Sequence, residues 1–182
     1  GGKVFPEIMV PLVSHVNEFR KARELLDQVA EEVIQKNGVK LKYKVGAMIE
    51  LPRAALTADE ISRDADFLSF GTNDLTQTLY GLCRDDAWSF MAEYLKKGIF
   101  QADPFCTMDR KGLGALIEIA VQKGKSSNQN IQLGVCGEHA ADPDSIDFFC
   151  QLGLDYVSCS PFQVPASRLA AAQAAIGDIP SG

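Results

Sequence analysis

Five short, mainly apolar runs recur along the chain, and each is followed by a turn. They span residues 8–13, 45–49, 67–70, 131–135 and 156–159. Short apolar runs bounded by turns are typical of strands that are buried on both faces. The pattern therefore predicts five buried strands.

Helical patterns separate these runs. Apolar positions in residues 19–34 repeat with helical spacing, and the stripe stops at Asn37-Gly38, a common helix end. A second helix is expected to begin at Thr57, because Thr57 and Glu60 have the spacing of a capping box. Each of these helices would follow a predicted strand.

Two more helices are expected nearer the carboxyl end. One runs from about Asp109 to Gly124, where apolar residues again recur every three or four positions. The other opens at Asp142-Pro143 and closes at Gly153, since proline is favoured in a first turn and glycine after a last one.

Strands that alternate with helices indicate an α/β fold with a parallel sheet and right-handed crossovers. Two architectures fit, an open doubly wound sheet and part of a (β/α)8 barrel. A complete barrel usually needs about 250 residues, whereas this chain has 182 and about five βα units. A barrel would therefore be partial and leave two strand edges open. We expect these edges to be covered by self-association, such as a homodimer, by swapping or by an unusual rearrangement.

Composition limits which partners and which cellular compartment are expected. The net charge is -6, and no segment is dense in Lys and Arg, which argues against nucleic acid. No run approaches eighteen uninterrupted apolar residues, so membrane insertion is not expected. The five cysteines include no CxxC pair, which argues against a disulfide framework or a zinc site. Reduced thiols indicate a reducing compartment, the cytoplasm, with a plastid or glycosome as alternatives.

Two carboxylates follow neighbouring predicted strands. Glu50 comes directly after residues 45–49, and Asp74 comes shortly after residues 67–70. Ligands collect at the carboxyl ends of parallel strands, where two carboxylates can share one Mg²⁺ and leave positions open for substrate oxygens. Alternatively, Glu50 is a helix-capping or solvated loop carboxylate, and Asp74 caps a helix that begins near Leu75.

Small polar groups surround Asp74. The turn reads Gly71-Thr72-Asn73-Asp74, and Asn73 offers both a donor and an acceptor without charge. Such an amide could orient a carboxylate or carbonyl group of a substrate. Its alternative role is that of an ordinary turn residue.

A cysteine lies at the end of the fourth predicted strand. Cys136 is followed by Gly137-Glu138-His139, so its thiol could act as a nucleophile or a proton donor. Most single cysteines are instead small buried apolar residues. His139 could equally be a structural hydrogen-bond partner or a proton carrier.

Three strings together are specific enough to indicate a family. They are VGAMIELPRAAL at residues 45–56, GTNDLTQ at 71–77 and GVCGEH at 134–139. They resemble the phosphoenolpyruvate-utilising enzymes, which comprise pyruvate phosphate dikinase, phosphoenolpyruvate synthase and enzyme I of the sugar phosphotransferase system. The likeness is strongest to the dikinases, because it continues through residues 84–86, 102–105 and 154–162.

The resemblance implies a fold and a set of site residues. Residues 1–176 would be the carboxyl-terminal portion of a (β/α)8 barrel that binds phosphoenolpyruvate and pyruvate, and residues 177–182 a disordered tail. Mg²⁺ would bind Glu50 and Asp74, and Cys136 would be the acid/base that moves a proton at the methylene carbon. The implied substrate contacts are Glu50, Gly71, Thr72, Asn73 and Asp74.

The resemblance also implies a parent reaction. A dikinase converts ATP, phosphate and pyruvate to AMP, pyrophosphate and phosphoenolpyruvate through a phosphorylated histidine. The nucleotide and phosphohistidine domains would lie upstream of this chain, which alone is expected to be inactive. The alternatives are a fragment of phosphoenolpyruvate synthase or of enzyme I, and a non-catalytic oligomerisation module.

Overall fold

The structure is a computed structural model that describes residues 4–177. Its five strands are parallel and form one sheet in the order β1-β2-β3-β4-β5. The strands are Glu7–Val10 (β1), Lys44–Ile49 (β2), Phe67–Gly71 (β3), Gln132–Cys136 (β4) and Tyr156–Ser158 (β5). All five predicted strands are confirmed. The first ends earlier than predicted, at Val10, because the Pro11 that follows has no N–H to donate to a neighbouring strand.

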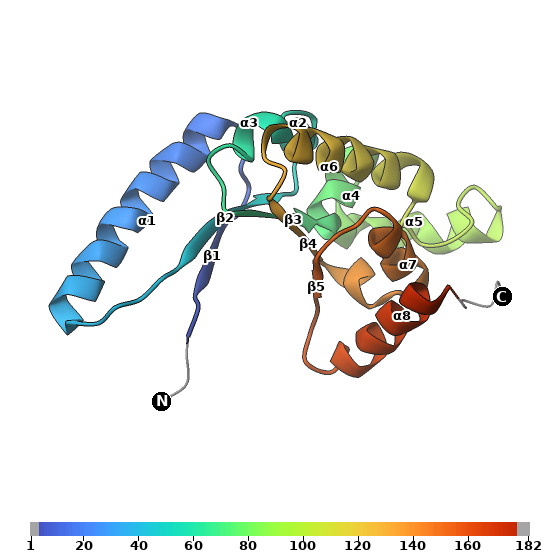
Figure 1. Ribbon diagram of the computed structural model, residues 1–182. Coiled ribbons are helices and arrows are strands. Elements are labelled where there is room, and N and C mark those ends of the chain that lie inside the picture. The colour runs from blue at the N-terminus through green and yellow to red at the C-terminus, as the bar shows by residue number, and fades with distance from the viewer. Residues whose placement is uncertain (1–3, 178–182) are drawn as a thin grey trace.

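The strand order distinguishes the two candidate architectures. A doubly wound sheet reverses its strand order and carries helices on both faces, whereas here each strand lies beside the next one in the sequence. Figure 1 shows the helices arched over the outer side of a curved sheet, from α1 on the left to α8 on the right. The fold is therefore a partial (β/α)8 barrel of five βα units.

The helices follow the strands in turn. They are α1 (Val16–Asn37), α2 (Pro52–Leu56), α3 (Ala58–Ile61), α4 (Thr72–Tyr80), α5 (Arg84–Lys96), the π-helical turn η1 (Arg110–Gly114), α6 (Ala115–Ser127), the 3-10 turn η2 (Glu138–Ala141), α7 (Pro143–Gln151) and α8 (Val164–Ile176). None of the helices within residues 4–177 has the length and apolar character needed to cross a membrane. The predicted tail, apart from Gly177, lies outside the described residues.

The helix predicted to begin at Thr57 is present as α3, with Thr57 directly before its first residue, but the predicted capping box is wrong, because no side-chain hydrogen bond caps this helix. The helical segment starts earlier, at Pro52, whose fixed φ and missing N–H suit a first turn. Thr57 instead separates α2 from α3, and its hydroxyl donates to the carbonyl of Arg53 at 2.9 Å. The chain therefore turns into a helix directly after Glu50 and holds that residue at the end of β2.

The core lies between the sheet and the helices. Every second residue of the inner strands points toward the helices and is inaccessible to solvent: Val45, Ala47, Ile49, Leu68, Phe70, Leu133 and Val135. On the opposite, concave face, the ring of Phe67 lies against Gly46 and that of Tyr156 against Gly134. A side chain at either glycine would overlap the ring, so these glycines let aromatic groups cover the concave face.

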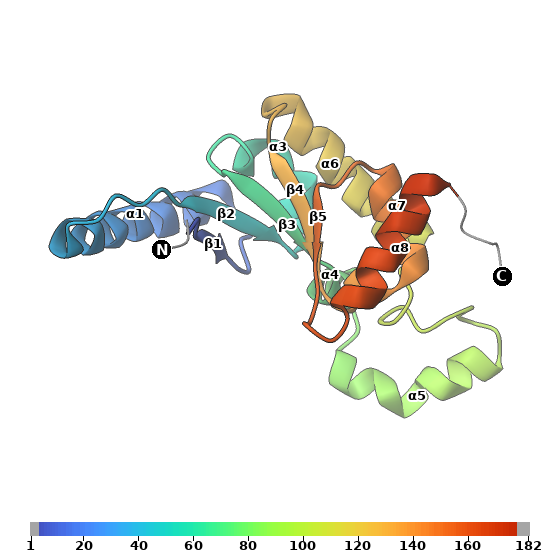
Figure 2. The same cartoon turned by 60° about the horizontal axis from the view of Figure 1, so that its bottom comes forward.

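Residues 81–109, here called the excursion, leave the barrel wall between α4 and η1. They carry α5, which Figure 2 shows standing apart from the other helices. The excursion has a small apolar cluster of its own, built on Ala87, Met91 and Phe105. It therefore folds as a separate lobe on the same crossover.

Candidate functional site

An open pocket of about 480 Å³ lies at the carboxyl ends of β2, β3 and β4. Its lining residues are Pro11, Leu12, Met48, Glu50, Gly71, Asn73, Asp74, Cys136 and Gly137. The structure thus brings five of the predicted site residues together, from three separate crossovers. Thr72 is buried beside this pocket without lining it.

Glu50 is almost completely buried, with 4% of its surface exposed. Its Oε1 accepts the backbone N–H of Leu12 at 2.7 Å. Leu12 holds the left-handed value φ 53, which is costly for a leucine and marks a constrained loop. Burial raises the pKa of the Glu50 carboxyl, and the hydrogen bond and charge of Asp74 add to that rise. The two carboxyl groups are therefore neighbours that repel each other when both are ionised.

Gly71 permits this close arrangement. A Cβ at position 71 would lie 2.7 Å from both Cβ and Oε2 of Glu50, a distance that no side chain tolerates without displacement. Asp74 lies in the first turn of α4, and its Oδ1 accepts from the side-chain amide of Gln77 at 3.0 Å. Since α4 begins at Thr72 and not near Leu75, Asp74 does not act as its cap.

The two carboxylates form an oxygen-only site. Within residues 4–177, no group of three or more His, Cys, Asp and Glu side chains could hold a metal. Mg²⁺, however, commonly takes only one or two carboxylates and completes its shell with water and substrate oxygens. A divalent cation would also remove the repulsion between Glu50 and Asp74. The residues present therefore fit Mg²⁺ bound together with a substrate.

The loop after β4 is fastened to the turn after β3. The Thr72 hydroxyl donates to the carbonyl of Cys136 at 3.0 Å, and the N–H of Glu138 donates to Oδ1 of Asn73, also at 3.0 Å. Gly137, at φ 107, makes this approach possible, since a Cβ there would lie 2.5 Å from the Thr72 hydroxyl. Thr72 therefore does not line the pocket, but it holds the loop of Cys136 and Gly137, which does.

The Cys136 thiol faces the pocket from the end of β4, and it donates a long hydrogen bond of 3.6 Å to the carbonyl of Phe70. Burial raises the pKa of this thiol, and the charges of Glu50 and Asp74 raise it further, while a hydrogen bond from Ser69 opposes them. The thiol therefore holds its proton at neutral pH. A protonated thiol is a poor nucleophile, but it can serve as a proton donor.

One further residue near the thiol, Ser69, was not predicted, because it does not lie at a strand end. Ser69 is buried in β3, and its hydrogen bonds act to lower the pKa of both Cys136 and Tyr156. Ser69 is the polar residue within an otherwise apolar run, two positions before Gly71 and hence on the same face of the strand. That two-residue spacing is the signal that could have identified it.

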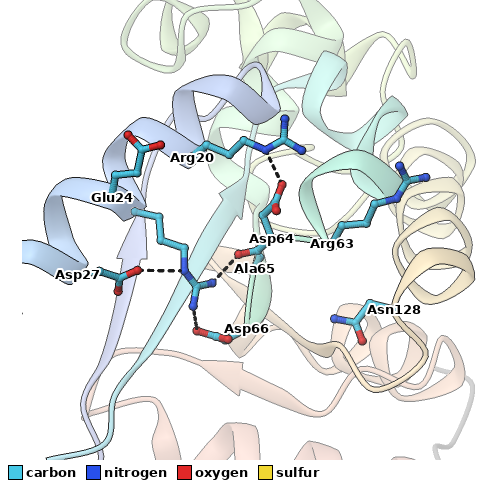
Figure 3. A pocket seen from close by; sticks show the side chains of 9 residues that line it. Arg20, Glu24, Asp27, Arg63, Asp64, Ala65, Asp66 and Asn128 are labelled. Atoms are coloured by element: carbon cyan, nitrogen blue, oxygen red, sulfur yellow. Dashed lines mark hydrogen bonds and ion pairs between the residues drawn. The ribbon is translucent and has the colours of Figure 1, made fainter.

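A second cavity, of about 530 Å³, lies near the amino end of β3, whereas Asp74 follows the carboxyl end of this strand. Figure 3 shows Arg20 directed at Asp64, whereas Glu24 and Arg63 point away from the ion pairs. Arg20 pairs with Asp64 at 2.8 Å, and Arg23 pairs with Asp66 at 3.0 Å. Because Asp64 and Asp66 already pair with Arg20 and Arg23, these charges join α1 to the amino end of β3, and the cavity is not a second candidate site.

The family of the chain follows from its sequence. The model of the family described as "PEP-utilising enzyme, PEP-binding domain" matches residues 2–176. The chain belongs to the phosphoenolpyruvate-utilising enzymes. The resemblance of the three strings is thereby confirmed.

Several members of this family are close relatives. The chain is 57% identical to the chloroplastic pyruvate, phosphate dikinase of Mesembryanthemum crystallinum over 95% of its length. It is 56% identical to the dikinase of Rhizobium meliloti over 97%, and 49% identical to that of Clostridium symbiosum over 98%. The chain spans 18% of the first relative and 20% of the other two.

The fold has a distant structural neighbour. A citrate lyase from Burkholderia xenovorans superimposes with a TM-score of 0.57 at 16% identity. The match covers 91% of this chain and 48% of the lyase. At this identity the similarity concerns the fold alone, and it agrees with a chain that forms part of a larger barrel.

Proposed function

We propose that this chain is the pyruvate- and phosphoenolpyruvate-binding part of a pyruvate phosphate dikinase. The observation that carries the proposal is the meeting of the Cys136 thiol with Glu50 and Asp74 in one pocket. The identity of 49–57% to three dikinases over nearly the whole chain supports it. The parent reaction would convert ATP, phosphate and pyruvate to AMP, pyrophosphate and phosphoenolpyruvate.

Glu50 and Asp74 are the proposed ligands of Mg²⁺. When bound, the ion would supply positive charge that stabilises the negative charge developing on the substrate oxygen during proton transfer. Glu50 is held for this role by the N–H of Leu12, and Asp74 by the amide of Gln77. Gly71 and Asn73 line the same pocket and are the proposed substrate contacts. Thr72 is proposed to contribute by holding the Cys136 loop.

Cys136 is proposed to carry the proton at the methyl carbon of pyruvate. In the direction of pyruvate formation its protonated thiol would donate to the methylene carbon, and in the reverse direction its thiolate would accept. The charges of Glu50 and Asp74 contribute to the raised pKa of this thiol. Neutralising them would bring the pKa closer to the pH at which both forms are available.

The proposed partners follow from the same relatives. Nucleotide and phosphohistidine domains of the parent would deliver the phosphoryl group, and self-association would cover open edges of the sheet. All five cysteines are unpaired in the structure, which supports a reducing compartment such as the cytoplasm or a plastid. Phosphoenolpyruvate synthase and enzyme I are less favoured, given the identity to dikinases, and a purely structural module would not need the thiol and carboxylates to converge.

The decisive experiment replaces Cys136 in the full-length enzyme. Cys136→Ala should abolish exchange of the pyruvate methyl protons with solvent deuterium, because the proton carrier is gone. Phosphorylation of the histidine by ATP should continue, since it does not involve this pocket. Exchange at the wild-type rate in the variant would remove Cys136 from the mechanism.

Two controls accompany this test. Cys150→Ala alters an exposed thiol on α7 and should leave exchange unchanged. The chain alone, given ATP, phosphate, pyruvate and Mg²⁺, should form no phosphoenolpyruvate. Product formation by the chain alone would contradict the need for upstream domains.

A further inference from the structure

His139 is completely buried, although it follows the Cys136 loop by only a few residues. Its Nε2 lies 2.8 Å from the carbonyl oxygen of Pro104. A carbonyl oxygen can only accept, so Nε2 must carry the proton. Nδ1 is then a bare acceptor, and it is buried without a hydrogen-bond partner among the described residues. The ring therefore makes a single directed hydrogen bond.

This hydrogen bond joins two parts of the chain that are 35 residues apart. Pro104 lies in the excursion, and His139 lies in η2, directly after the loop that carries Cys136. The nearby ion pair between Arg84 and Glu138 spans the same gap at 3.5 Å. That pair is exposed, and such pairs contribute little. The buried bond of His139 is therefore the stronger link between the excursion and the Cys136 loop.

Both sides of this link are anchored elsewhere. The Ser167 hydroxyl of α8 donates to the carbonyl of Ala140 at 3.0 Å, which fixes η2 from the outside. The N–H of Met108 donates to the Ser145 hydroxyl of α7 at 3.2 Å, which fixes the end of the excursion. His139 thus bridges two segments that are each held elsewhere.

We propose that His139 is a positioning residue, whose hydrogen bond to Pro104 holds the Cys136 loop against the excursion and so sets the place of the thiol in the pocket. The inference rests on the proposed function, because it concerns the placement of the proposed proton carrier. It also assigns a use to the excursion: this lobe supports the loop after β4 from outside the barrel wall.

A role as proton carrier does not fit His139. The residue is not among those that line the pocket. Burial lowers its pKa, against weaker opposite effects of Pro104, Asp142 and Glu138, while Arg84 lowers it further. The ring is therefore neutral at physiological pH, and its one N–H is already donated.

The test compares two replacements of similar length in the full-length enzyme. His139→Gln keeps a side-chain N–H that can reach the Pro104 carbonyl, whereas His139→Met fills similar space without a donor. We expect the Gln variant to exchange the pyruvate methyl protons at nearly the wild-type rate, with an unchanged pH profile. We expect the Met variant to lose about 10- to 100-fold in the exchange rate, with little change in KM.

The outcomes separate the possibilities. Wild-type exchange in the Met variant would overturn the positioning role. Equal losses in both variants, with one limb of the pH profile removed, would also overturn it and make the imidazole itself the proton carrier. Histidine phosphorylation by ATP, measured in parallel, shows that the phosphoryl-transfer steps outside this pocket are intact.

A second measurement does not depend on catalysis. The rate at which iodoacetamide alkylates Cys136 in the present chain, followed by mass spectrometry of the Cys136 peptide, reports how well the loop is held. Alkylation should be about tenfold faster in the Met variant than in the wild type or the Gln variant. Equal alkylation rates in all three proteins would overturn the inference, even if the full-length enzyme exchanges the pyruvate methyl protons. If the full-length wild type does not exchange the pyruvate methyl protons, but the alkylation rates differ as expected, only the proposed function is overturned.

Discussion

The side-chain oxygen of Asn73 accepts the backbone N–H of Glu138 at 3.0 Å. Because this bond directs the oxygen toward Glu138, the amide nitrogen is the donor that Asn73 offers to a ligand in the pocket that it lines. Asn73 is therefore oriented as a hydrogen-bond donor. A donor is suited to a carboxylate or enolate oxygen, and less so to a cation.

Asn73→Asp tests this orientation. The variant keeps an oxygen that can accept from Glu138, but it replaces the donor with a negative charge beside Asp74. We expect kcat/KM for pyruvate in the full-length enzyme to fall about 10- to 100-fold, the loss typical of one hydrogen bond to a charged group. The exposed change Asn130→Asp serves as the control. Wild-type kinetics in Asn73→Asp would show that the amide nitrogen does not contact the substrate.

Gly71→Ala tests the close packing at the floor of the pocket. Its Cβ would lie 2.7 Å from Glu50 Oε2 and 3.0 Å from Met48 Sδ. Because these groups must move, we expect the variant to lose about 1–3 kcal/mol in the free energy of unfolding, and to bind Mg²⁺ and pyruvate more weakly in calorimetry.

Gly124→Ala is the matched control for that change. A Cβ at position 124 would make an ordinary contact of 3.5 Å with Leu68. Alanine is the better helix former, so this variant in α6 should be neutral or more stable by up to about 1 kcal/mol. If both alanines destabilise equally, the loss at Gly71 does not come from Glu50.

The strands could be predicted from the sequence because burial on both faces demands continuous apolar runs. Their order could not, since hydrophobic periodicity identifies elements but not neighbours. Among the helices that were not predicted are α8 and α5. The sequence of α8, from Val164 to Ile176, is small and apolar nearly throughout, so it lacks a polar face from which a helix could be recognised. In α5, half-buried residues pack against a local cluster and not the main core.

The site was predictable in part for a related reason. Polar groups such as Glu50, Asp74 and Cys136 stand out where apolar strands end, and the barrel topology then gathers them. The N–H of Leu12 could not be anticipated, because backbone groups have no signature in the sequence. Nor could the contact of His139 with Pro104, which depends on the path that the excursion takes in space.

The ion pairs of Arg20 with Asp64 and of Arg23 with Asp66 can be compared directly. Arg23 is less exposed than Arg20, at 29% against 49% of the side chain, and it also donates to the carbonyl of Asp64. Its partner Asp66 accepts the N–H of Val45 at 2.8 Å. We expect Arg23→Met to lose about 1–2 kcal/mol in urea unfolding, because hydrogen bonds to charged groups are broken.

Arg20→Met should cost at most about 0.5 kcal/mol, since exposed ion pairs contribute little. The two variants remove the same chemical group from the same helix, so the difference between them isolates the effect of partial burial. Equal losses in urea unfolding would show that the contacts of Arg23 with Asp64 and Asp66 add nothing to an exposed pair.

Glu50→Gln tests the electrostatic cost of the carboxylate pair. The raised pKa of Glu50 means that its ionised form is disfavoured in the folded chain. Its contribution to stability is therefore complete below the unfolded pKa, near pH 4, and is lost as the pH rises through the higher folded pKa. At pH 7 without divalent cations, Glu50→Gln should consequently be more stable, with a melting temperature about 2–4 °C higher. The advantage should vanish at pH 4.

Mg²⁺ should reverse the order of stability of the wild type and Glu50→Gln. Binding to the native state stabilises it, so Mg²⁺ with pyruvate should raise the melting temperature of the wild type but not that of Glu50→Gln, which offers only one carboxylate. The exposed change Glu118→Gln should match the wild type under both conditions. Destabilisation by Glu50→Gln at pH 7 without cations would contradict the repulsion between Glu50 and Asp74. An equal Mg²⁺ response in both proteins would exclude Glu50 as a ligand.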